Sequence, residues 1–396
     1  MERYQDALSY VTAVAPNRAT FGARPHAAAK AARYFLDHFP GEVAYAYKAN
    51  SSVFLIGALY GAGIRQFDVA SIPELEDAAT IPDATLHYMH PVKSREAIRR
   101  AYHEFGVKCF ALDTETELEK IREETGNADD LQLFVRLSVP AMETMIPLER
   151  KFGIGGDDAV ALLSKARQAC DELGIAFHVG SQTATPEAYV AALKVARAAI
   201  VKAGVVIDCI DVGGGFPARY GPEPTIPLTK YFSVIEERFE DMPVSYDCRL
   251  ICEPGRALVA EAESLIVRVD ARRGNELFIN DGAYGGLFDA THLEFAFPVR
   301  LLRPESELKP AETPFALWGP TCDSIDHMPG PFLLPDDVRE GDYLEFGNMG
   351  AYARAIAGQF NGYGKYNEII LEDEPMYSMF DQQEVAARAS EPTPAE

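Results

Sequence analysis

The length of 396 residues allows two domains, or one barrel with an appended domain, and 47% hydrophobic with 24% charged residues is typical of a globular protein. The formal net charge of −23 argues against nucleic acid as a partner, because an acidic surface repels a polyanion. No apolar run approaches the roughly 18 residues of a membrane span, and the first residues lack the apolar segment of a signal peptide, so we expect no membrane association.

The six cysteines are scattered along the chain, and only Cys248 and Cys252 lie close together. No histidine stands beside them at the spacing of a zinc site, so we predict no metal. A disulfide framework is not expected in a chain of this size without a secretory signal. We therefore expect a reducing, cytoplasmic compartment.

Helical and strand-like segments alternate after an N-terminal segment, 1–24. The predicted helices are 25–38, 52–61, 72–80 (with Ser71 as N-cap), 94–105, 114–125, 157–173 and 186–203. The predicted strands are 43–47, 66–70, 85–89, 108–112, 131–138, 175–179 and 206–212. This alternation predicts a parallel sheet, and the number of units predicts a (β/α)8 TIM barrel over 25–262. A doubly wound open sheet is the competing architecture, but no GxGxxG follows the first strand, which leaves its dinucleotide-binding version little support.

The pattern of predicted secondary structure changes after about residue 260, where short strands are separated by turns rich in Gly, Pro and Asp. The predicted strands are 264–269, 276–279, 298–302, 314–318 and 342–346. We predict an all-β domain over 263–379, with antiparallel pairing and with 1–24 packed against it. The polar end of the chain, 380–396, is predicted to be a disordered tail.

Lys48 follows an apolar strand, where a lone ammonium is costly to bury. One interpretation is a structural lysine whose head group reaches water at the strand end. The other is a Schiff-base lysine, because burial lowers the pKa of a lysine and makes a free amine available.

Two glycine-containing motifs follow later strands. In 211–217, DVGGGFP, three glycines leave backbone N–H groups accessible to an anion such as phosphate, although a plain tight turn would need the same residues. In 252–256, CEPGR, Glu253 can hold a ring nitrogen of pyridoxal 5′-phosphate (PLP) in its protonated state. The alternative for Glu253 is an ion pair with Arg256 inside a turn.

Two further motifs place reactive side chains in loops. In 177–182, FHVGSQ, His178 can stack on a flat ring and Ser181 can bind phosphate, although a lone histidine is more often structural. In 319–326, GPTCDSID, the thiol of Cys322 can act as a general acid and Asp323 can bind a cationic group. The alternative is a buried cysteine beside solvated aspartates.

Seven motifs together resemble the fold type III PLP-dependent amino acid decarboxylases, the group that acts on ornithine, lysine, diaminopimelate and arginine. The likeness covers about 25–370 and keeps the order of the family. It is carried by YKAN at 47–50, FDVAS at 67–71, FHVGSQ at 177–182, DVGGGFP at 211–217, CEPGR at 252–256, GPTCDSID at 319–326 and GNMGAY at 347–352. The resemblance implies an alanine racemase-like (β/α)8 barrel with a C-terminal β domain and PLP as cofactor.

The resemblance also implies a role for each cofactor-side residue. Lys48 would hold PLP as a Schiff base, Glu253 would pair with the pyridinium nitrogen, and His178 would stack on the ring. Asp68 and Glu74 would lie near Lys48 and the ring, and Arg136 near the O3′ side. The phosphate would be bound by Ser181, Gly214, Gly215, Gly255, Arg256 and the hydroxyl of Tyr352.

In the family the GPTCD loop crosses into the other subunit, so the resemblance implies a homodimer with shared active sites. Cys322 would return a proton to the substrate Cα, and Asp323 would bind the distal amine of the amino acid substrate. Tyr284 and Phe360 would line the substrate pocket. Lys151 and Asp326 match residues that pair across that interface.

One departure concerns the short helix that selects the substrate in the family, here 287–295. Leu293 occupies its acidic position and Glu294 follows one residue later, which is a rotation of about 100° on a helix. Asp289 or His292 can substitute. We predict decarboxylation of ornithine and/or lysine to putrescine or cadaverine in polyamine biosynthesis. The alternatives are diaminopimelate, arginine, a less cationic amino acid, or a catalytically silent regulator similar to the antizyme inhibitors, against which the presence of Lys48, Cys322 and Asp323 argues.

Overall fold

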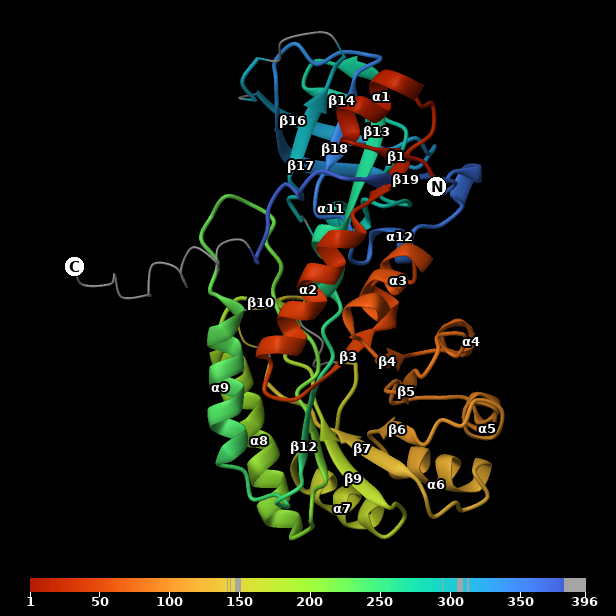
Figure 1. Cartoon of the computed structure of the whole chain (residues 1–396), viewed down its shortest axis with the longest axis vertical. Helices are drawn as coiled ribbons and strands as arrows, with labels where there is room; N and C mark the ends of the chain where they lie inside the picture. Colours follow the sequence, from red (N-terminus) through yellow and green to blue (C-terminus); the bar gives the residue numbers. More distant parts are fainter. Residues whose placement is uncertain are drawn as a thin grey trace, which may run out of the picture.

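Eight parallel strands close into a barrel in the computed structural model of the chain, which describes residues 1–140, 142, 144–146, 151–293, 295–304, 309–311 and 313–380 (Figure 1). Around the barrel the strands follow the order β11, β12, β3, β4, β5, β6, β7 and β9. Their bounds are β3 Glu42–Ala46, β4 Gln66–Val69, β5 Thr85–Tyr88, β6 Cys109–Leu112, β7 Gln132–Arg136, β9 Glu172–Ala176, β11 Cys209–Asp211 and β12 Arg249–Cys252. The predicted (β/α)8 barrel is therefore confirmed.

Helices cover the outside of the barrel between successive strands (Figure 1). They are α2 Pro25–His38, α3 Val53–Ala62, α4 Ile72–Ala78, α5 Arg95–His103, α6 Glu115–Glu124, α7 Gly156–Arg167, α8 Glu187–Ala203 and α9 Leu228–Glu240. Ser71 caps α4 as predicted, because its side chain accepts a hydrogen bond from the backbone of Glu74. Among the described helices, none combines the length and the apolar character that crossing a bilayer requires.

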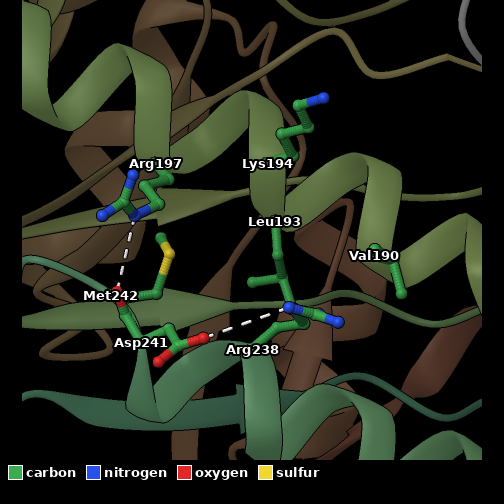
Figure 2. A pocket seen from close by; sticks show the side chains of 7 residues that line it. All are labelled: Val190, Leu193, Lys194, Arg197, Arg238, Asp241 and Met242. Carbon is green, nitrogen blue, oxygen red and sulfur yellow. Dashed lines mark hydrogen bonds and ion pairs between the residues drawn. The ribbon is translucent and has the colours of Figure 1, made fainter.

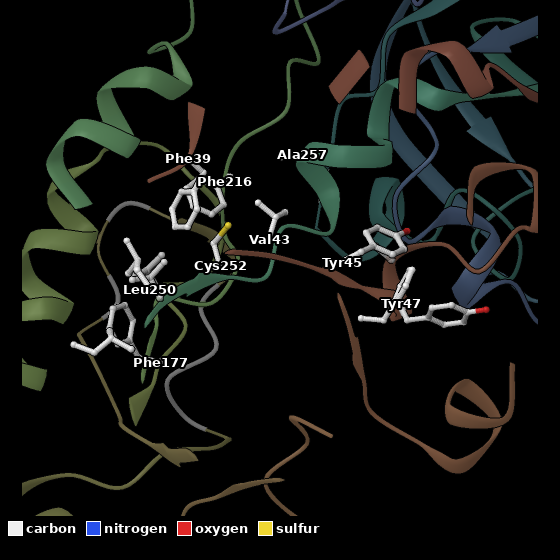
Figure 3. Close-up of a cluster of buried hydrophobic side chains, with 14 of the residues drawn as sticks. Phe39, Val43, Tyr45, Tyr47, Phe177, Phe216, Leu250, Cys252 and Ala257 are labelled. Atoms are coloured by element: carbon white, nitrogen blue, oxygen red, sulfur yellow. The ribbon is translucent and has the colours of Figure 1, made fainter. Parts of the chain in front are cut away.

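The side chains of each barrel strand alternate between the helices outside and the barrel interior. In β3, Val43, Tyr45 and the following Tyr47 belong to the large core cluster beneath the helices, part of which is shown in Figure 3. Ala44 lies between them and belongs instead to the small cluster inside the barrel. The same period of two runs through the other strands and decides which residue reaches the barrel mouth.

The second domain is a nine-stranded sheet in which β1, β19, β2, β13, β14, β16 and β17 lie side by side, and β18 and β15 continue from β13. The bounds are β1 Arg3–Tyr4, β2 Thr20–Ala23, β13 Glu263–Arg273, β14 Glu276–Ile279, β15 Val299–Leu302, β16 Thr313–Trp318, β17 His327–Leu334, β18 Tyr343–Phe346 and β19 Asn367–Leu371. The prediction of antiparallel pairing was wrong for three neighbours, β1–β19, β19–β2 and β14–β16, which are parallel. Two of these pairs involve N-terminal strands that join the sheet before the barrel begins.

Short elements complete the chain and lie next to functional segments. They are α1 Ala7–Val14, the 3-10 turn η1 Tyr47–Ala49, α10 Arg256–Val259, η2 Ala260–Ala262, α11 Phe288–His292, α12 Ala353–Ile356, η3 Phe360–Gly362, and a two-stranded antiparallel sheet of β8 Thr144–Ile146 with β10 Ser181–Thr183. The predicted disordered tail falls almost wholly in 381–396, outside the described residues.

The boundary between α7 and β9 differs from the prediction of one helix over 157–173. The helix ends at Arg167, and β9 starts at Glu172 and contains Gly174. A Cβ added at Gly174 would lie 2.5 Å from the ring of Phe134 on the neighbouring strand, so a glycine is needed for the strands to pair here. Helix α9 was not predicted, although Leu228, Tyr231, Phe232 and Ile235 are buried at the helical spacing i, i+3, i+4 and i+7.

Arg24, at the entrance to α2, ties the start of the barrel to the sheet domain. Its side chain is 1% exposed and donates hydrogen bonds to Glu345 at 3.0 Å, to Ser264 at 2.5 Å and to both carboxylate oxygens of Asp373 at 2.9 and 3.0 Å. A buried ion pair of this kind stabilises little in total, but it becomes costly when one partner is removed.

We expect Arg24→Met to lower the free energy of unfolding by about 3–5 kcal/mol, because the fully buried carboxylate of Glu345 would lose one of its two arginines. Arg18→Met, at an exposed position six residues earlier, serves as the control and should change stability by no more than about 0.5 kcal/mol. Urea unfolding of both variants measures the difference, and equal unfolding midpoints would contradict the role given to Arg24.

Candidate active site

The mouth of the barrel collects ionisable side chains from six strands. At the carboxyl end of each of these six strands, the position that faces the barrel interior carries a polar residue. Its neighbours in the sequence belong mostly to the core cluster beneath the helices. The interior residues are Lys48 after β3, Asp68 in β4, Arg136 at the end of β7, His178 after β9, Asp211 at the end of β11 and Glu253 after β12. All lie at the carboxyl ends of parallel strands, which is where barrel proteins place their active sites.

Lys48 forms an ion pair with Asp68, with Nζ 2.7 Å from Oδ2. Its side chain remains 43% exposed, while that of Asp68 is 1% exposed. Desolvation alone would lower the pKa of Lys48, but Asp68, Tyr352 and Glu253 outweigh it and raise this pKa above its ordinary value. Burial lowers the pKa of Lys48 as expected, but the neighbouring acidic groups reverse the net shift, so burial alone does not provide a free amine here.

Glu253 lies opposite this pair beside a second carboxylate, Asp211. Burial raises the pKa of Glu253 well above its ordinary value, and the charges of Asp211 and Asp68 raise it further. Burial likewise raises the pKa of Asp211 to about 7, although its carboxylate accepts a hydrogen bond from the backbone of Gly213 at 2.8 Å. Oε1 of Glu253 is buried without a hydrogen-bond partner. This corner of the site therefore has an acceptor and excess negative charge that a cationic N–H group would satisfy.

His178 is held as a neutral imidazole. Its Nδ1 accepts a hydrogen bond from the backbone N–H of Gly180 at 3.0 Å, which leaves the proton on Nε2. Burial lowers the pKa of His178 to about 3, and the cations Arg136 and Lys48 contribute in the same direction. The imidazole of His178 is therefore neutral near pH 7.

The glycine loop after β11 packs closely against His178 and Glu253. Gly213 and Gly215 have φ angles of 68° and 104°, which favour glycine. A Cβ added at Gly214 would lie 2.6 Å from the carbonyl oxygen of Glu253 and 3.3 Å from Nε2 of His178. The loop therefore approaches the other two residues so closely that no side chain fits at its centre.

Arg256 provides buried positive charge on the same side of the mouth. Its guanidinium contacts Ser181 Oγ at 3.3 Å and Tyr220 Oη at 2.9 Å, and it lies 5.1 Å from the ring centroid of Tyr352. Gly255 precedes it, and a Cβ there would lie 3.4 Å from the hydroxyl of Tyr352. An arginine, two hydroxyl groups and glycine backbone in one place are suited to binding a phosphate.

These features fit PLP as the bound group. Glu253 offers an unpaired buried acceptor for a protonated ring nitrogen, His178 offers a neutral ring to stack on, and Lys48 offers an amine for the aldehyde. The region around Gly215, Ser181 and Arg256 offers the phosphate site. Within the described residues, no group of three or more His, Cys, Asp or Glu side chains is placed to hold a metal ion.

Two of the predicted cofactor-side residues lie at the edge of this group. Glu74 accepts a hydrogen bond from the backbone of Ala70 at 2.7 Å, and burial raises its pKa. Arg136 projects from the end of β7 and lies 5.6 Å from the ring centroid of Phe152. Both are therefore within the charged surroundings of Lys48 and His178, because Lys48 lowers the pKa of Glu74 and Arg136 lowers that of His178.

The predicted substrate-side residues form a separate cluster on the sheet domain. The hydroxyl of Tyr284 donates a hydrogen bond to Asp323 at 2.5 Å, and its ring lies 4.9 Å from that of Phe360. Cys322 is exposed, and its backbone N–H donates to Asn361 at 3.1 Å. Among the described residues, the hydrogen bonds and ring contacts of Tyr284, Cys322 and Asp323 stay within this cluster.

Asp326, in the same loop, is satisfied by its own chain. It is 1% exposed and accepts hydrogen bonds from the backbone of Ala283 at 2.7 Å and from both the backbone and the hydroxyl of Thr321 at 3.0 and 2.7 Å. Lys151, its expected partner across an interface, lies 5.1 Å from the ring centroid of Phe152.

The candidate specificity helix, α11, directs its two candidate substrate residues differently. Asp289 is buried and lies 3.5 Å from Arg256, so it contacts the phosphate-side group. His292 is exposed and stacks on Phe288 at 4.1 Å. Glu294 lies outside the described residues.

Two residues of the site were not singled out from the sequence. Asp211 stands immediately before the glycine loop at an interior strand position, and the period of two in β11 could have identified it. Tyr220 reaches Arg256 from the loop after the glycines, and no local pattern marks it.

A surface cavity of about 410 Å³ lies between α8 and α9, away from this site. Figure 2 shows its polar rim, where Arg197 donates to the carbonyl oxygen of Asp241 at 3.4 Å and Arg238 lies 4.0 Å from its carboxylate. None of the predicted site residues lines this cavity, so it does not belong to the candidate active site.

Comparison with known proteins shows where the chain belongs. The model of the pyridoxal-binding domain of pyridoxal-dependent decarboxylases matches residues 25–260. The lysine/ornithine decarboxylase of Selenomonas ruminantium is 30% identical over 352 residues, which cover 86% of each chain. The ornithine decarboxylase of Mus musculus is 31% identical over 85% of this chain and 77% of the relative. Antizyme inhibitor 2 of Xenopus laevis is 33% identical over 81% of this chain and 73% of the relative.

Solved structures give the same result. The arginine decarboxylase of Paramecium bursaria Chlorella virus bound to agmatine superimposes with a TM-score of 0.80, at 27% identity over 91% of this chain and 98% of that chain. The lysine decarboxylase of Selenomonas ruminantium in complex with PLP and cadaverine gives a TM-score of 0.80, at 26% identity over 99% and 98%. The chain therefore belongs to the pyridoxal-dependent decarboxylase family, and its cofactor is pyridoxal 5′-phosphate.

Proposed function

We propose that this protein decarboxylates a basic L-amino acid, ornithine and/or lysine, and releases putrescine or cadaverine for polyamine biosynthesis. The observation that carries the proposal is Lys48 at the barrel mouth, ion-paired with Asp68 and facing the unpaired Oε1 of Glu253. The names of the relatives and solved neighbours, which include lysine, ornithine and arginine decarboxylases, support a basic substrate.

The barrel residues would hold the cofactor and keep its ring charged. Lys48 would bind the aldehyde through Nζ, Ser181, Gly215 and Arg256 would bind the phosphate, and His178 would support one ring face. Glu253 would hold a proton at the ring nitrogen, because Oε1 of its buried carboxylate has no hydrogen-bond partner in the protein. PLP, when bound, supplies an electron sink for the charge left at Cα as CO2 departs.

The sheet-domain cluster would supply the remaining groups from the other subunit of a homodimer. Cys322 would donate a proton to Cα, and Asp323 would bind the distal ammonium group of the substrate. The hydrogen bond from Tyr284 lowers the pKa of Asp323, so this carboxylate stays ionised at neutral pH. The exposure of Cys322 supports a site completed by a partner.

Asp323 would be the main carboxylate for the distal amine. The other described acid near the pocket, Asp289, lies 3.5 Å from Arg256 and is used there. A single half-buried carboxylate would bind the distal ammonium group of either diamino acid, which favours both lysine and ornithine as substrates.

A silent regulator is the second candidate, because one relative is an antizyme inhibitor. The presence of Lys48, Cys322 and Asp323 favours catalysis. Cytoplasmic localisation remains a prediction.

A substrate panel tests the activity of the PLP-loaded full chain. We expect CO2 release from lysine and ornithine with a kcat/KM about 10- to 100-fold above that of norleucine, which lacks the distal ammonium group of lysine, because an ionic hydrogen bond to Asp323 would be missing. Arginine and diaminopimelate complete the panel. The decarboxylase proposal fails if PLP is bound to Lys48 and none of these amino acids releases CO2, and fastest turnover of arginine would overturn the diamine assignment.

Mixing two inactive variants tests whether the site is shared. We expect Lys48→Ala to lose the visible absorbance of covalently bound PLP and Cys322→Ala to lower kcat about 100-fold. An equimolar mixture should recover about a quarter of the wild-type activity, because random exchange in a two-fold dimer makes half of the dimers heterodimers, each with one intact site.

The matched control mixes Lys48→Ala with the double variant Lys48→Ala/Cys322→Ala, in which no pairing restores a complete site. Recovery equal to that of the control would show that Lys48 and Cys322 act within one chain.

A further inference from the structure

The turn that carries Lys48 is held against the sheet domain by a buried polar network. The network consists of Asn50, two residues after the lysine, with Glu263 at the start of β13 and Arg354 in α12. None of the three belongs to the cofactor or substrate groups described above. They lie where the end of β3 meets the sheet domain.

Asn50 uses both ends of its amide. Its Nδ2 donates to Oε2 of Glu263 and to the carbonyl oxygen of Gly350, each at 2.8 Å, and its Oδ1 accepts from the backbone of Ser52 at 2.8 Å. The carbonyl oxygen of Asn50 accepts from the hydroxyl of Tyr45, also at 2.8 Å. With the side chain 1% exposed, these bonds fix one end of the Lys48 turn.

Glu263 is a buried glutamate whose carboxylate accepts hydrogen bonds from Asn50 and Arg354. It is fully buried, and burial raises its pKa, while Arg354 and Asn50 lower it. Nη2 of Arg354 donates to Oε1 at 3.1 Å, so each carboxylate oxygen has its own donor. A buried ion pair of this kind contributes little to stability in total, because the cost of burying the charges offsets their attraction.

The same loop also fixes Tyr352 relative to Lys48. The backbone N–H of Tyr352 donates to the carbonyl oxygen of Ala49, next to Lys48, at 2.9 Å. Tyr352 has a φ angle of 63°, an uncommon value for a residue with a side chain, so its conformation depends on such contacts. The two residues that follow Lys48, Ala49 and Asn50, are therefore both hydrogen-bonded to the segment 350–352.

We propose that Glu263 is a positioning residue that, through Asn50 and Arg354, holds the Lys48 turn and the loop of Tyr352 in the relative arrangement that covalent cofactor binding requires. The inference rests on the proposed function only in taking Lys48 as the lysine that binds PLP. It concerns residues that touch neither the cofactor nor the substrate.

Glu263→Gln tests this with the smallest change in shape. The amide replaces one acceptor by a donor, which would face a donor of either Asn50 or Arg354. The control is Glu345→Gln, an equally buried glutamate of the same sheet whose carboxylate binds Arg24 at 3.0 Å and Arg300 at 2.7 Å and contacts no residue of the Lys48 turn. Both variants lose a buried ion pair, so a purely structural effect should be shared.

Three measurements distinguish the two variants. We expect Glu263→Gln to raise the Kd of PLP and to lower kcat by about tenfold each, with KM changed less than about threefold, because a small displacement of a reacting group is costly. Borohydride reduction at limiting PLP, followed by peptide mass analysis, should give less pyridoxyl-Lys48. Glu345→Gln should retain wild-type PLP affinity and yield while its melting temperature falls at least as much.

Equal PLP affinity and equal adduct yield in the two variants would overturn the proposal. If Glu263→Gln does not fold, the variant Arg354→Lys tests the proposal instead. It is expected to fold, because the side chain of Arg354 is 21% exposed and the change keeps its charge. Wild-type PLP affinity in Arg354→Lys would then overturn the proposal, and a raised Kd would support it. The PLP measurements need no substrate, so an inactive substrate panel would refute the proposed function without deciding this inference.

Discussion

The period of two along the barrel strands is the constraint on which the site depends. Ala44, Phe134, Ala176, Cys209 and Ile251 fill the barrel interior, and each is followed at its strand's mouth by a polar residue on the same face. The outward neighbours, such as Tyr45 and Leu250, pack beneath the helices. A shift of one residue in any strand would exchange these two sets, so the register that builds the core also aims the functional side chains.

Charge balance at the mouth explains why these side chains coexist. Asp68, Asp211 and Glu253 bring three carboxylates into a buried region in which Lys48 is the cation paired directly with one of them. Burial raises the pKa values of Glu253 and Asp211, and repulsion from the charge of Asp68 raises both further. Glu253 would hold a ring that carries a proton at nitrogen, and Arg256 would supply the positive charge for its phosphate.

Much of the fold could be predicted from the sequence, and the elements that could not be predicted depend on contacts between distant residues. The barrel units were visible because each joins an apolar strand to an amphipathic helix. The end of α7 was misplaced because Gly174 is required by contact with Phe134, a neighbour distant in the sequence. The parallel pairs β1–β19 and β19–β2 could not be predicted. Strands β1 and β2 contain two and four residues, and so short a sequence does not indicate which strand it pairs with. Motifs singled out Lys48, His178 and Glu253 as candidates, whereas Glu263 and Tyr220 make contacts that no motif records.

The N-terminal strands have a consequence for synthesis on the ribosome. Ala23 of β2 pairs with Glu263 of β13, so the whole barrel is inserted between two adjacent strands of one sheet. These first strands emerge early, yet their partners β13 and β19 emerge only after the barrel has been made. Closing so long a loop adds an entropic barrier and leaves strand edges unpaired in the meantime. The nascent barrel must therefore fold while attached to an unfinished sheet, and this interval is the stage at which the chain is most exposed to misassociation.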